Sequence, residues 1–261
     1  MSAPLLDVRN VTMQFGGLKA VEGLSFQVHK GQLAGLIGPN GAGKTTVFNM
    51  LTGVYTPTSG EVAFESKKVS GLKPYEISSH GLTRTFQNIR LFKNLTVLDN
   101  VLIANHQHVQ YTWADALLLS QAFESEEKKI TEKAKEILHI FGLSNKFHEK
   151  SSNLPYGEQR KLEIVRALMT EPKMILLDEP AAGMNHSETH SLMELIAKIR
   201  KEFNLTVLLI EHDMKLVMGI CEQIFVLDHG VKIEEGAPEK IKSSKKVIEA
   251  YLGVDAESES H

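Results

Sequence analysis

The stretch Leu33-Ala-Gly-Leu-Ile37-Gly38-Pro39-Asn40-Gly41-Ala42-Gly43-Lys44-Thr45 decides the fold of this 261-residue chain. Its first part, Leu33–Ile37, is short, apolar and bounded by glycines, as a buried strand is. The eight residues Gly38–Thr45 follow at once and match the pattern Gly-x-x-x-x-Gly-Lys-Thr. Thr45–Leu51 has helical character and ends before Gly53. A strand, a glycine-rich loop and a helix in this order predict a phosphate-binding loop.

The residue types of this loop indicate which ligand it takes. Glycines allow backbone N–H groups to close around phosphate oxygens, and the helix N-terminus adds a partial positive charge. Lys44 supplies a point charge to the β- and γ-phosphates, and the Thr45 hydroxyl is suited to ligate Mg²⁺. A chance glycine-rich turn is the alternative, which the flanking strand and helix disfavour. We therefore expect ATP and Mg²⁺ to bind here, on the residues Gly38, Pro39, Asn40, Gly41, Ala42, Gly43, Lys44, Thr45 and Thr46.

A second apolar strand, Met174–Leu177, ends in the carboxylates Asp178 and Glu179. Asp178 is expected at the mouth of the sheet, where it would contact Mg²⁺ through water. Glu179 would then polarise an attacking water molecule. An Asp-Glu pair after a strand is usually a helix cap or a solvated loop, and only its combination with the phosphate loop favours the catalytic interpretation.

The rest of the chain alternates strands and helices around one helical interruption. Strand patterns also occur at Leu5–Val11, Leu24–Val28, Glu61–Phe64, Thr206–Ile210 and Ile224–Leu227, and Asp228-His229-Gly230 predicts a hairpin turn into Val231–Glu234. Between residues 88 and 165 only helical patterns remain, among them Val97–Val109 and Trp113–Phe123. We therefore predict an α/β fold with a largely parallel sheet. One domain, residues 1–253, would have its core in 1–87 and 166–253, a helical subdomain in 88–165, and a flexible acidic tail in 254–261.

Bulk properties exclude several classes of function. The net charge is −3 and Lys and Arg are spread along the chain, which argues against nucleic acid as the main partner. No apolar run approaches the roughly 18 residues of a membrane span. The first seven residues do not read as a signal peptide. We expect a cytoplasmic protein that reaches a membrane, if it works at one, through other subunits.

Five ordered motifs identify a family. Gly38–Thr45, Gln87, the segment Leu154-Pro155-Tyr156-Gly157-Glu158-Gln159, Asp178-Glu179 and His212 resemble the motifs of the nucleotide-binding subunits of ABC transporters, over almost the whole chain. The segments Gly81–Phe92, Glu179–Asn185, Glu211–Met218 and Ala250–Gly253 are similar to the G-type (LivG) ATPases of high-affinity branched-chain amino acid importers. This resemblance implies a P-loop NTPase (RecA-like) core with an N-terminal antiparallel β portion and an inserted helical subdomain.

The resemblance implies that residues at matching positions of this chain have the same roles as the family's motif residues. Phe15 matches an aromatic residue that stacks on adenine, although Tyr is more usual in the family and a lone Phe is usually part of a core. Gln87 matches a glutamine that touches Mg²⁺ and the attacking water and signals to the membrane subunit. His212 matches a histidine that contacts the γ-phosphate. Asn185 stands where the family usually has Asp. The implied catalytic residues are Glu179, His212, Gln87 and Lys44, and the implied metal-binding residues are Thr45, Gln87 and Asp178.

The segment Leu154–Glu158 departs from the family's usual Leu-Ser-Gly-Gly-Gln. Leu154 and Gly157 match, whereas Pro155, Tyr156 and Glu158 replace Ser, Gly and Gln. In the family this segment opens a helix that points at the partner subunit's γ-phosphate. The backbone N–H of Gly157 and the helix dipole would still serve a partner's ATP, but Pro155 offers neither a hydroxyl nor an N–H. The branched-chain subfamily is similarly divergent, so the departure favours that subfamily.

The resemblance also implies partners. Two ATPase subunits, identical or homologous, would clamp two ATP molecules, and two integral membrane permease subunits would dock near Gln87–Phe92. An extracytoplasmic solute-binding protein would deliver the solute, so the chain would lie at the cytoplasmic face of the cell membrane. An importer of branched-chain amino acids is the leading hypothesis. A urea or short-chain amide importer, a soluble ABC ATPase acting on DNA or ribosomes, and a non-hydrolysing regulatory module are the alternatives.

Overall fold

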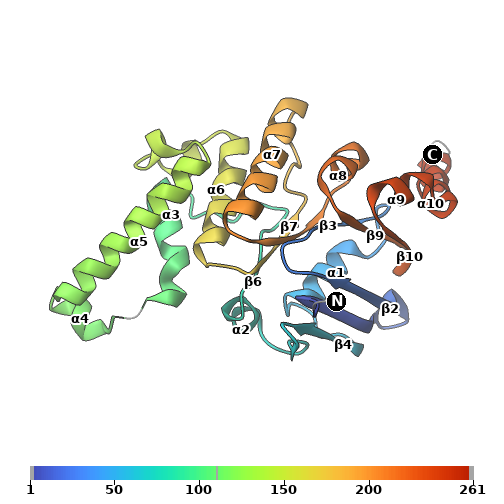
Figure 1. The fold of residues 1–261 in the computed structure, drawn as a ribbon, viewed down its shortest axis with the longest axis horizontal. Helices are drawn as coiled ribbons and strands as arrows, with labels where there is room; N and C mark the ends of the chain where they lie inside the picture. Colours follow the sequence, from blue (N-terminus) through green and yellow to red (C-terminus); the bar gives the residue numbers. More distant parts are fainter. Residues whose placement is uncertain (1–2, 110, 259–261) are drawn as a thin grey trace.

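The computed structural model describes residues 3–109 and 111–258, which form two sheets and a projecting helical arm (Figure 1). The larger sheet has the strand order β10-β9-β3-β8-β7-β6. All neighbours in it pair in parallel except β9 and β10, which form the antiparallel hairpin predicted at Asp228–Gly230. Its strands are β3 (Leu33–Ile37), β6 (Leu82–Arg84), β7 (Met174–Asp178), β8 (Thr206–Ile210), β9 (Gln223–Asp228) and β10 (Val231–Gly236). The predicted largely parallel sheet is confirmed.

The smaller sheet is antiparallel and contains the N-terminal strands, drawn in blue in Figure 1. Its order is β2-β1-β4-β5, with β1 (Leu6–Phe15), β2 (Leu18–Val28), β4 (Ser59–Phe64) and β5 (Lys67–Lys68). The expected antiparallel portion is therefore present. β1 and β2 are longer than predicted, because their pairing continues past several irregularities as far as Phe15 and Leu18.

The strand β3 faces two hydrophobic cores because successive side chains point to opposite faces of a sheet. Leu33 and Ile37 belong to the core beneath the helices α6 (Tyr156–Met169), α7 (His186–Glu202) and α8 (Met214–Ile220). Ala34 and Leu36 belong to a second core, shared with the antiparallel sheet and with α1 (Lys44–Leu51). The phosphate loop starts at the end of this fully buried strand, so its position is fixed from both sides.

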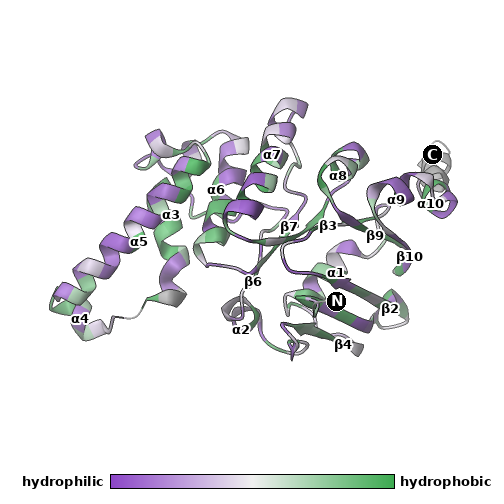
Figure 2. Cartoon of the chain, viewed as in Figure 1, coloured by the Kyte–Doolittle hydropathy of each residue, from purple (hydrophilic) through white to green (hydrophobic). Residues whose placement is uncertain are grey.

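Between β6 and β7 the described residues form only helices and loops. This part contains α3 (Val97–Ala104), the 3₁₀ turn η1 (Asn105–His108), α4 (Trp113–Leu117), α5 (Gln121–Ile140), the 3₁₀ turns η2 (Ser144–Lys146) and η3 (Ser151–Asn153), and α6. Most residues of α5 are hydrophilic, as its mainly purple ribbon shows (Figure 2). The predicted boundary at residue 165 falls inside α6, so the insertion returns to the core through a continuous helix.

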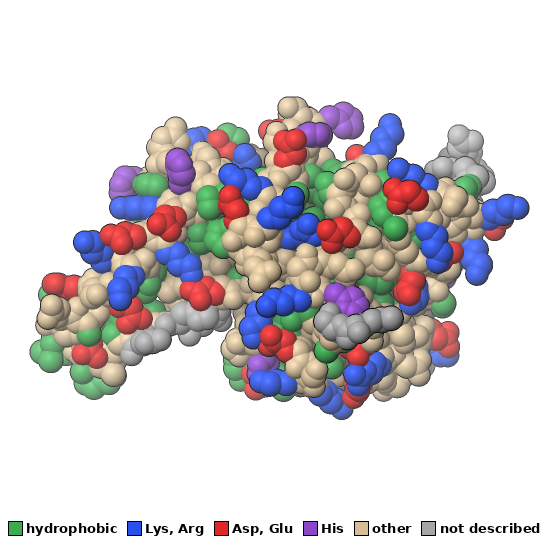
Figure 3. Space-filling model, viewed as in Figure 1, with side chains coloured by type: hydrophobic (Ala, Val, Ile, Leu, Met, Phe, Trp, Pro, Cys, Tyr) green, Lys and Arg blue, Asp and Glu red, His purple; other side chains and the backbone are tan. Residues whose placement is uncertain are grey.

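Two predicted helices of the insertion are shorter in the structure. Trp113–Phe123 is interrupted at Leu118–Ser120, because Leu119 adopts a left-handed backbone with φ 48° and the Ser120 hydroxyl caps the following helix. Val97–Val109 ends as an α-helix at Ala104 and continues as η1. Around this interruption, at the free end of the arm that α4 and α5 form, four apolar side chains are exposed (Figure 3): Trp113, Leu117, Leu118 and Leu119.

The C-terminal part contains the helices α9 (Pro238–Ser243) and α10 (Lys245–Ser258), and a short helix α2 (Pro74–Ser79) precedes β6. Residues 254–258, expected to be part of a flexible tail, are helical, since Gly253 does not end the helix. Residues 259–261 of that predicted tail lie outside the described part. Within the residues described, no helix combines the length and apolarity required to span a membrane.

Candidate active site

The phosphate loop ends at a helix N-terminus that no side chain caps. Gly43 precedes α1 with φ 98°, and α1 has no side-chain cap hydrogen bond. A Cβ atom at Gly43 would lie 2.6 Å from the carbonyl oxygen of Ala20, so only glycine fits. The first N–H groups of α1 have no partner within their helix and are available to an anion.

Lys44 occupies the centre of the loop as a buried cation, with 6% of the residue exposed. Its Nζ donates hydrogen bonds to the carbonyl oxygens of Gly38 (2.7 Å) and Pro39 (2.8 Å). Burial lowers the pKa of Lys44, and the charges of Glu179 and Asp178 oppose this effect. The loop therefore holds a positive charge that is only partly compensated.

The ends of β7 and β8 bring Glu179 beside His212. β7 and β8 are paired in register, Asp178 opposite Ile210, and the Glu179 N–H donates to the carbonyl of Ile210 (3.0 Å). Glu179 adopts φ 47°, an unusual left-handed backbone for a residue other than glycine. Such a backbone occurs in turns, as at Leu119, and also at functional sites.

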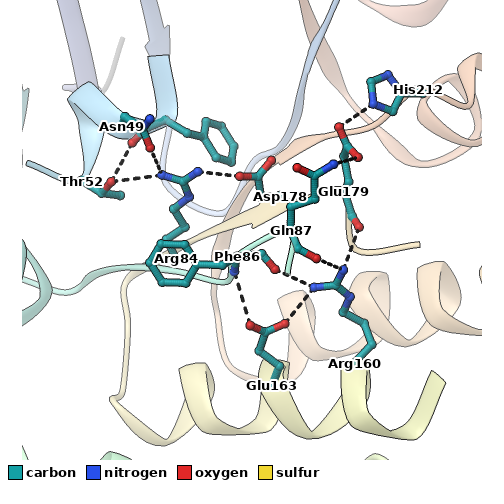
Figure 4. Close-up of polar contacts among 11 residues, drawn as sticks. Asn49, Thr52, Arg84, Phe86, Gln87, Arg160, Glu163, Asp178, Glu179 and His212 are labelled. Carbon is teal, nitrogen blue, oxygen red and sulfur yellow. Dashed lines mark hydrogen bonds and ion pairs between the residues drawn. The ribbon is translucent and has the colours of Figure 1, made fainter. Parts of the chain in front are cut away.

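The carboxylate of Glu179 accepts hydrogen bonds from two sides (Figure 4). Gln87 Nε2 donates to Oε2 over 2.7 Å, and His212 Nε2 lies 2.5 Å from Oε1. Both partners are distant in sequence, and each is among the predicted site residues. The structure therefore brings Gln87 and His212 together on the carboxylate of Glu179.

A pocket of about 510 Å³ connects this group with the phosphate loop. Fourteen residues line it: Leu18, Lys19, Ala20, Asn40, Gly41, Ala42, Gly43, Lys44, Thr45, Thr46, Gln87, Glu179, His212 and His229. Ten of these are predicted site residues. Leu18, Lys19, Ala20 and His229 were not predicted, and no sequence pattern marks them, because they lie on a strand and a hairpin turn that reach the pocket through tertiary packing.

Some predicted residues lie outside the lining of this pocket: Phe15, Gly38, Pro39, Gly157 and Asp178. Phe15 is 43% exposed at the end of β1 and meets the ring of Tyr55 edge-on, with 5.3 Å between ring centroids. Its exposed face is suited to stacking, but adenine stacking by Phe15 stays a prediction.

Asp178 is buried beside the pocket and forms an ion pair with Arg84 Nη2 at 2.5 Å. Arg84 also donates to Asn49 Oδ1 (2.7 Å), so the pair links β6, α1 and β7. For Mg²⁺, the predicted residues offer a hydroxyl on Thr45, an amide oxygen on Gln87 and a carboxylate on Asp178. These hard oxygen donors fit Mg²⁺, which usually binds one or two protein groups together with phosphates and water.

The segment Leu154–Glu158 does not line this pocket and contains the start of α6 at Tyr156. Pro155 is the N-cap residue and provides no side-chain cap. A Cβ at Gly157 would lie 3.4 Å from Glu188 Oε1, on the neighbouring helix α7. Asn185 caps that helix: its Oδ1 accepts from the N–H of Glu188 and its own N–H donates to Glu188 Oε2, both at 3.0 Å. The amide at position 185 thus has a local structural role in the capping box.

Three buried side chains around the site were not predicted: Glu211, Arg160 and Glu163. Glu211 accepts hydrogen bonds from the N–H groups of Ala181 (2.9 Å) and His212 (3.3 Å), and so joins the loops after β7 and β8. Burial raises the pKa of Glu211. Arg160 and Glu163 stand three residues apart among the apolar positions of α6, and that spacing was the available signal.

Family models match two parts of the chain. Residues 21–182 match the model described as ABC transporter. Residues 231–257 match the model described as branched-chain amino acid ATP-binding cassette transporter.

Curated relatives resemble the chain over nearly its whole length. It is 47% identical to the high-affinity branched-chain amino acid transport ATP-binding protein BraF of Pseudomonas aeruginosa, over 97% of this chain and 99% of that protein. Identity to the corresponding protein LivG of Escherichia coli is 46%, with the same coverage. These relatives agree with the resemblance that the motifs indicated.

Solved structures resemble the chain in fold. The ADP conformation of MJ1267, an ATP-binding cassette of an ABC transporter, has a TM-score of 0.84 and 34% identity, covering 97% of this chain and all of the other. A dimeric post-hydrolysis state of the cassette MJ0796, bound to ADP and phosphate, has a TM-score of 0.74 and 25% identity, covering 89% of this chain and 98% of the other.

Proposed function

The chain belongs to the ATP-binding subunits of ABC transporters, and from this membership we propose that it powers uptake of branched-chain amino acids by hydrolysing ATP. The observation that carries the proposal is the position of Glu179. Its carboxylate lies at a pocket formed by the phosphate loop, between the Gln87 amide and the His212 imidazole. A phosphate-binding loop facing an oriented carboxylate is the arrangement that hydrolysis of a nucleoside triphosphate requires.

The residues divide the chemistry between them. Lys44 and the N–H groups at the start of α1 bind the phosphates and stabilise the negative charge that develops on them. Glu179 orients the attacking water and accepts its proton. His212 approaches the γ-phosphate, and Gln87 orients the carboxylate of Glu179 and the water. We assign Phe15 to adenine stacking on the strength of its exposed ring and the family resemblance.

Mg²⁺ belongs to the same proposal. Thr45, Gln87 and Asp178 would hold it, Asp178 through water. The ion would neutralise charge on the β- and γ-phosphate oxygens. The ion pair with Arg84 fixes the Asp178 carboxylate at the end of β7.

The site needs a second ATPase subunit. Gly157 and the start of α6 do not line the chain's own pocket, so we propose that they serve the ATP of a partner, which is a second copy or a homologue. The dimeric cassette MJ0796, which this chain resembles, supports this arrangement. Two permease subunits would dock near Gln87–Phe92, and an extracytoplasmic binding protein would bring the solute. The chain would then act at the cytoplasmic face of the membrane as one domain, in which α10 continues past the predicted boundary at residue 253.

The cargo follows from the relatives, because this subunit does not itself contact the solute. The names of the relatives and the model matched by residues 231–257 favour branched-chain amino acids over urea or short amides. The binding protein encoded with the importer would decide between them: titration with leucine, isoleucine and valine, and with urea and acetamide, measures which class binds.

The variant Glu179→Gln tests the catalytic assignment. It keeps the size of the side chain but replaces one acceptor oxygen with an amide N–H donor group and removes the base, so we expect ATP hydrolysis by the purified importer to fall by about 100-fold or more. ATP binding should persist, because the phosphate loop is unchanged. Phosphate release and equilibrium nucleotide binding measure the two effects. Turnover close to that of the wild type would remove Glu179 from the role of base.

A further inference from the structure

One face of α6 contacts the segment 86–92 through three charged side chains. Arg160, Glu163 and Arg166 are spaced by three residues, so they lie along the same side of the helix. Arg160 is fully buried and Glu163 is 5% exposed. The segment that they contact contains the catalytic Gln87 and the other proposed permease-docking residues.

The guanidinium group of Arg160 contacts backbone carbonyl oxygens of two segments, residues 86–87 and residue 179 (Figure 4). Nη1 donates to the carbonyl oxygen of Phe86 (2.7 Å), and Nη2 donates to that of Gln87 (2.6 Å). Nη2 also lies 3.5 Å from the carbonyl oxygen of Glu179. One side chain from the first turns of α6 therefore contacts the main chain of both residues that meet through their side chains at the pocket.

Glu163 completes this link from the same helix. Its Oε2 accepts from Arg160 Nη1 (2.8 Å), and its Oε1 lies 3.5 Å and 3.4 Å from the N–H groups of Phe86 and Arg90. Burial raises the pKa of Glu163, while the charge of Arg160 lowers it. At the far end of the segment, Arg166 donates to the carbonyl of Arg90 and lies over the Phe92 ring, 5.1 Å from its centroid.

Packing alone does not require these charges. α6 already buries Leu162, Ile164, Val165 and Leu168 in the main core. A buried ion pair usually contributes little net stability compared with apolar side chains of similar size. The planar guanidinium group, in contrast, holds several acceptors in a fixed geometry that an apolar side chain cannot provide. The contacts of Arg160 therefore fix the backbone segments that it binds relative to one another.

We propose that Arg160, held by Glu163, is a positioning residue that fixes Gln87 and Glu179 relative to the start of α6. A shift of the segment 86–92 by a docked permease is then transmitted to two places: the Gln87–Glu179 contact at this chain's pocket, and Gly157 at the partner's ATP. Neither Arg160 nor Glu163 lines the pocket. This inference rests on the proposed ATPase function and names how the site is coupled to its partners.

The test uses the assembled importer in proteoliposomes with Arg160→Gln and Glu163→Gln. A misplacement of about 1 Å can lower a rate by up to about 100-fold, so we expect kcat for Arg160→Gln to fall by about 10- to 100-fold. The ATP concentration at half-maximal rate should change by less than about 3-fold, because the phosphate loop is untouched. Glu163→Gln should lower kcat in the same direction by a smaller factor, and Arg160→Lys should not restore it, because an ammonium group lacks the planar fork.

Lys161→Gln is the matched control, since it removes a charge from the neighbouring, partly exposed position of α6. Its kcat should equal that of the wild type. The second control is a double-mutant cycle with Gln87→Ala. If Arg160 acts through Gln87, Arg160→Gln should cost much less in the Gln87→Ala background than in the wild type.

Two results would overturn the inference. One is an unchanged kcat for both Arg160→Gln and Glu163→Gln in an importer whose wild type hydrolyses ATP. The other is an equal loss with and without Gln87, which would mean that Arg160 acts independently of it. Thermal melting of each variant separates loss of folding from loss of positioning, with Glu163→Gln as the milder change. Failure of the proposed function is distinct, because there the wild-type importer itself would not hydrolyse ATP.

Discussion

Lys44 shows how one side chain prepares the phosphate loop for its ligand. Its ammonium group donates to two carbonyl oxygens of its own loop and is buried beneath the glycines. Those hydrogen bonds occupy two of the three N–H donors of the ammonium group. Both acceptors are neutral carbonyls, so neither provides an opposite charge. A phosphate bound at the loop supplies that counter-ion, which is why the affinity for nucleotide depends on this residue.

We therefore expect Lys44→Ala to abolish measurable ATP binding. Loss of the charge leaves the helix N-terminus as the main source of positive potential, and that contributes only about 0.3–1 kcal/mol at an exposed site. Titration of the purified chain with a fluorescent ATP analogue measures the affinity. Lys30→Ala, at an exposed position outside the pocket, is the control and should bind as the wild type does. Unchanged affinity of Lys44→Ala would contradict the assignment of the phosphate loop.

Individual residues were predictable where chemistry and local spacing coincide. Lys44 and Glu179 stand at fixed positions after apolar strands, and the ordered motifs identified Gln87 and His212. For Arg160 the only signal was its spacing from Glu163 on α6, because the backbone carbonyls of Phe86 and Gln87 that it binds are more than seventy residues away in the sequence. The capping role of Asn185 was visible only once α7 was known to begin at His186, which makes Glu188 its third residue.

At the scale of elements, α8 packs against β3 across a glycine. A Cβ at Gly35 would lie 3.0 Å from Val217 Cγ1 and 3.2 Å from Cys221 Sγ. Val217 is fully buried and Cys221 is 5% exposed, so neither side chain has room to move. The close approach sets the distance between the helix and the strand that leads into the phosphate loop.

Gly35→Ala should therefore destabilise the protein. Overpacking costs about 1–3 kcal/mol, which exceeds the roughly 0.5–1 kcal/mol gained by replacing glycine within a strand. Urea denaturation measures the free energy of unfolding. Gly219→Ala on α8, where a Cβ meets nothing within 4 Å, is the matched control and should be neutral or slightly stabilising.

The sole cysteine gives a second measurement of the same contact. Burial raises the pKa of the Cys221 thiol to about 12, so it should react slowly with iodoacetamide at pH 8 in the wild type. Gly35→Ala should accelerate this alkylation, because it forces α8 away from β3. A variant as stable and as unreactive as the wild type would show that the contact adapts without cost.

Elements were predictable where the apolar pattern was long enough. The buried strands β7 and β8 follow continuous apolar runs, and their predicted positions agree to within one residue. β6, with three residues, and β5, with two lysines, were missed because strands this short show no alternation of apolar and polar residues. The interruption at Leu118–Ser120 was missed for a related reason: three leucines in succession, Leu117–Leu119, look like helix until the backbone of Leu119 turns.

At the scale of the whole molecule, the pocket and the start of α6 belong to different ATP sites. Gly157→Asp should separate them, because it adds a negative charge where the proposed partner's γ-phosphate would approach. ATP binding by the isolated chain should be unchanged, while hydrolysis by the assembled importer should fall by about 10-fold or more, the effect of about 1.4 kcal/mol.

Gly219→Asp, an exposed glycine on another helix, is the control for the added charge and should hydrolyse ATP normally. Nucleotide titration and phosphate release are the two measurements. Loss of ATP binding by isolated Gly157→Asp would show that α6 serves the chain's own pocket after all. The largely parallel sheet and its helical insertion were predictable from the order of strands and helices, whereas the antiparallel sheet was implied only by the family resemblance. The projection of α4 and α5 was not, because composition does not fix the direction of an arm.

The left-handed backbone of Glu179 has a consequence for attempts to make this protein more heat-resistant. A non-glycine residue at such an angle costs about 1–2 kcal/mol, and asparagine tolerates the conformation better. A library screened only for thermal tolerance would therefore enrich replacements at position 179. Each would discard the carboxylate that the strained backbone presents to the pocket, so screens of this kind should keep residue 179 constant.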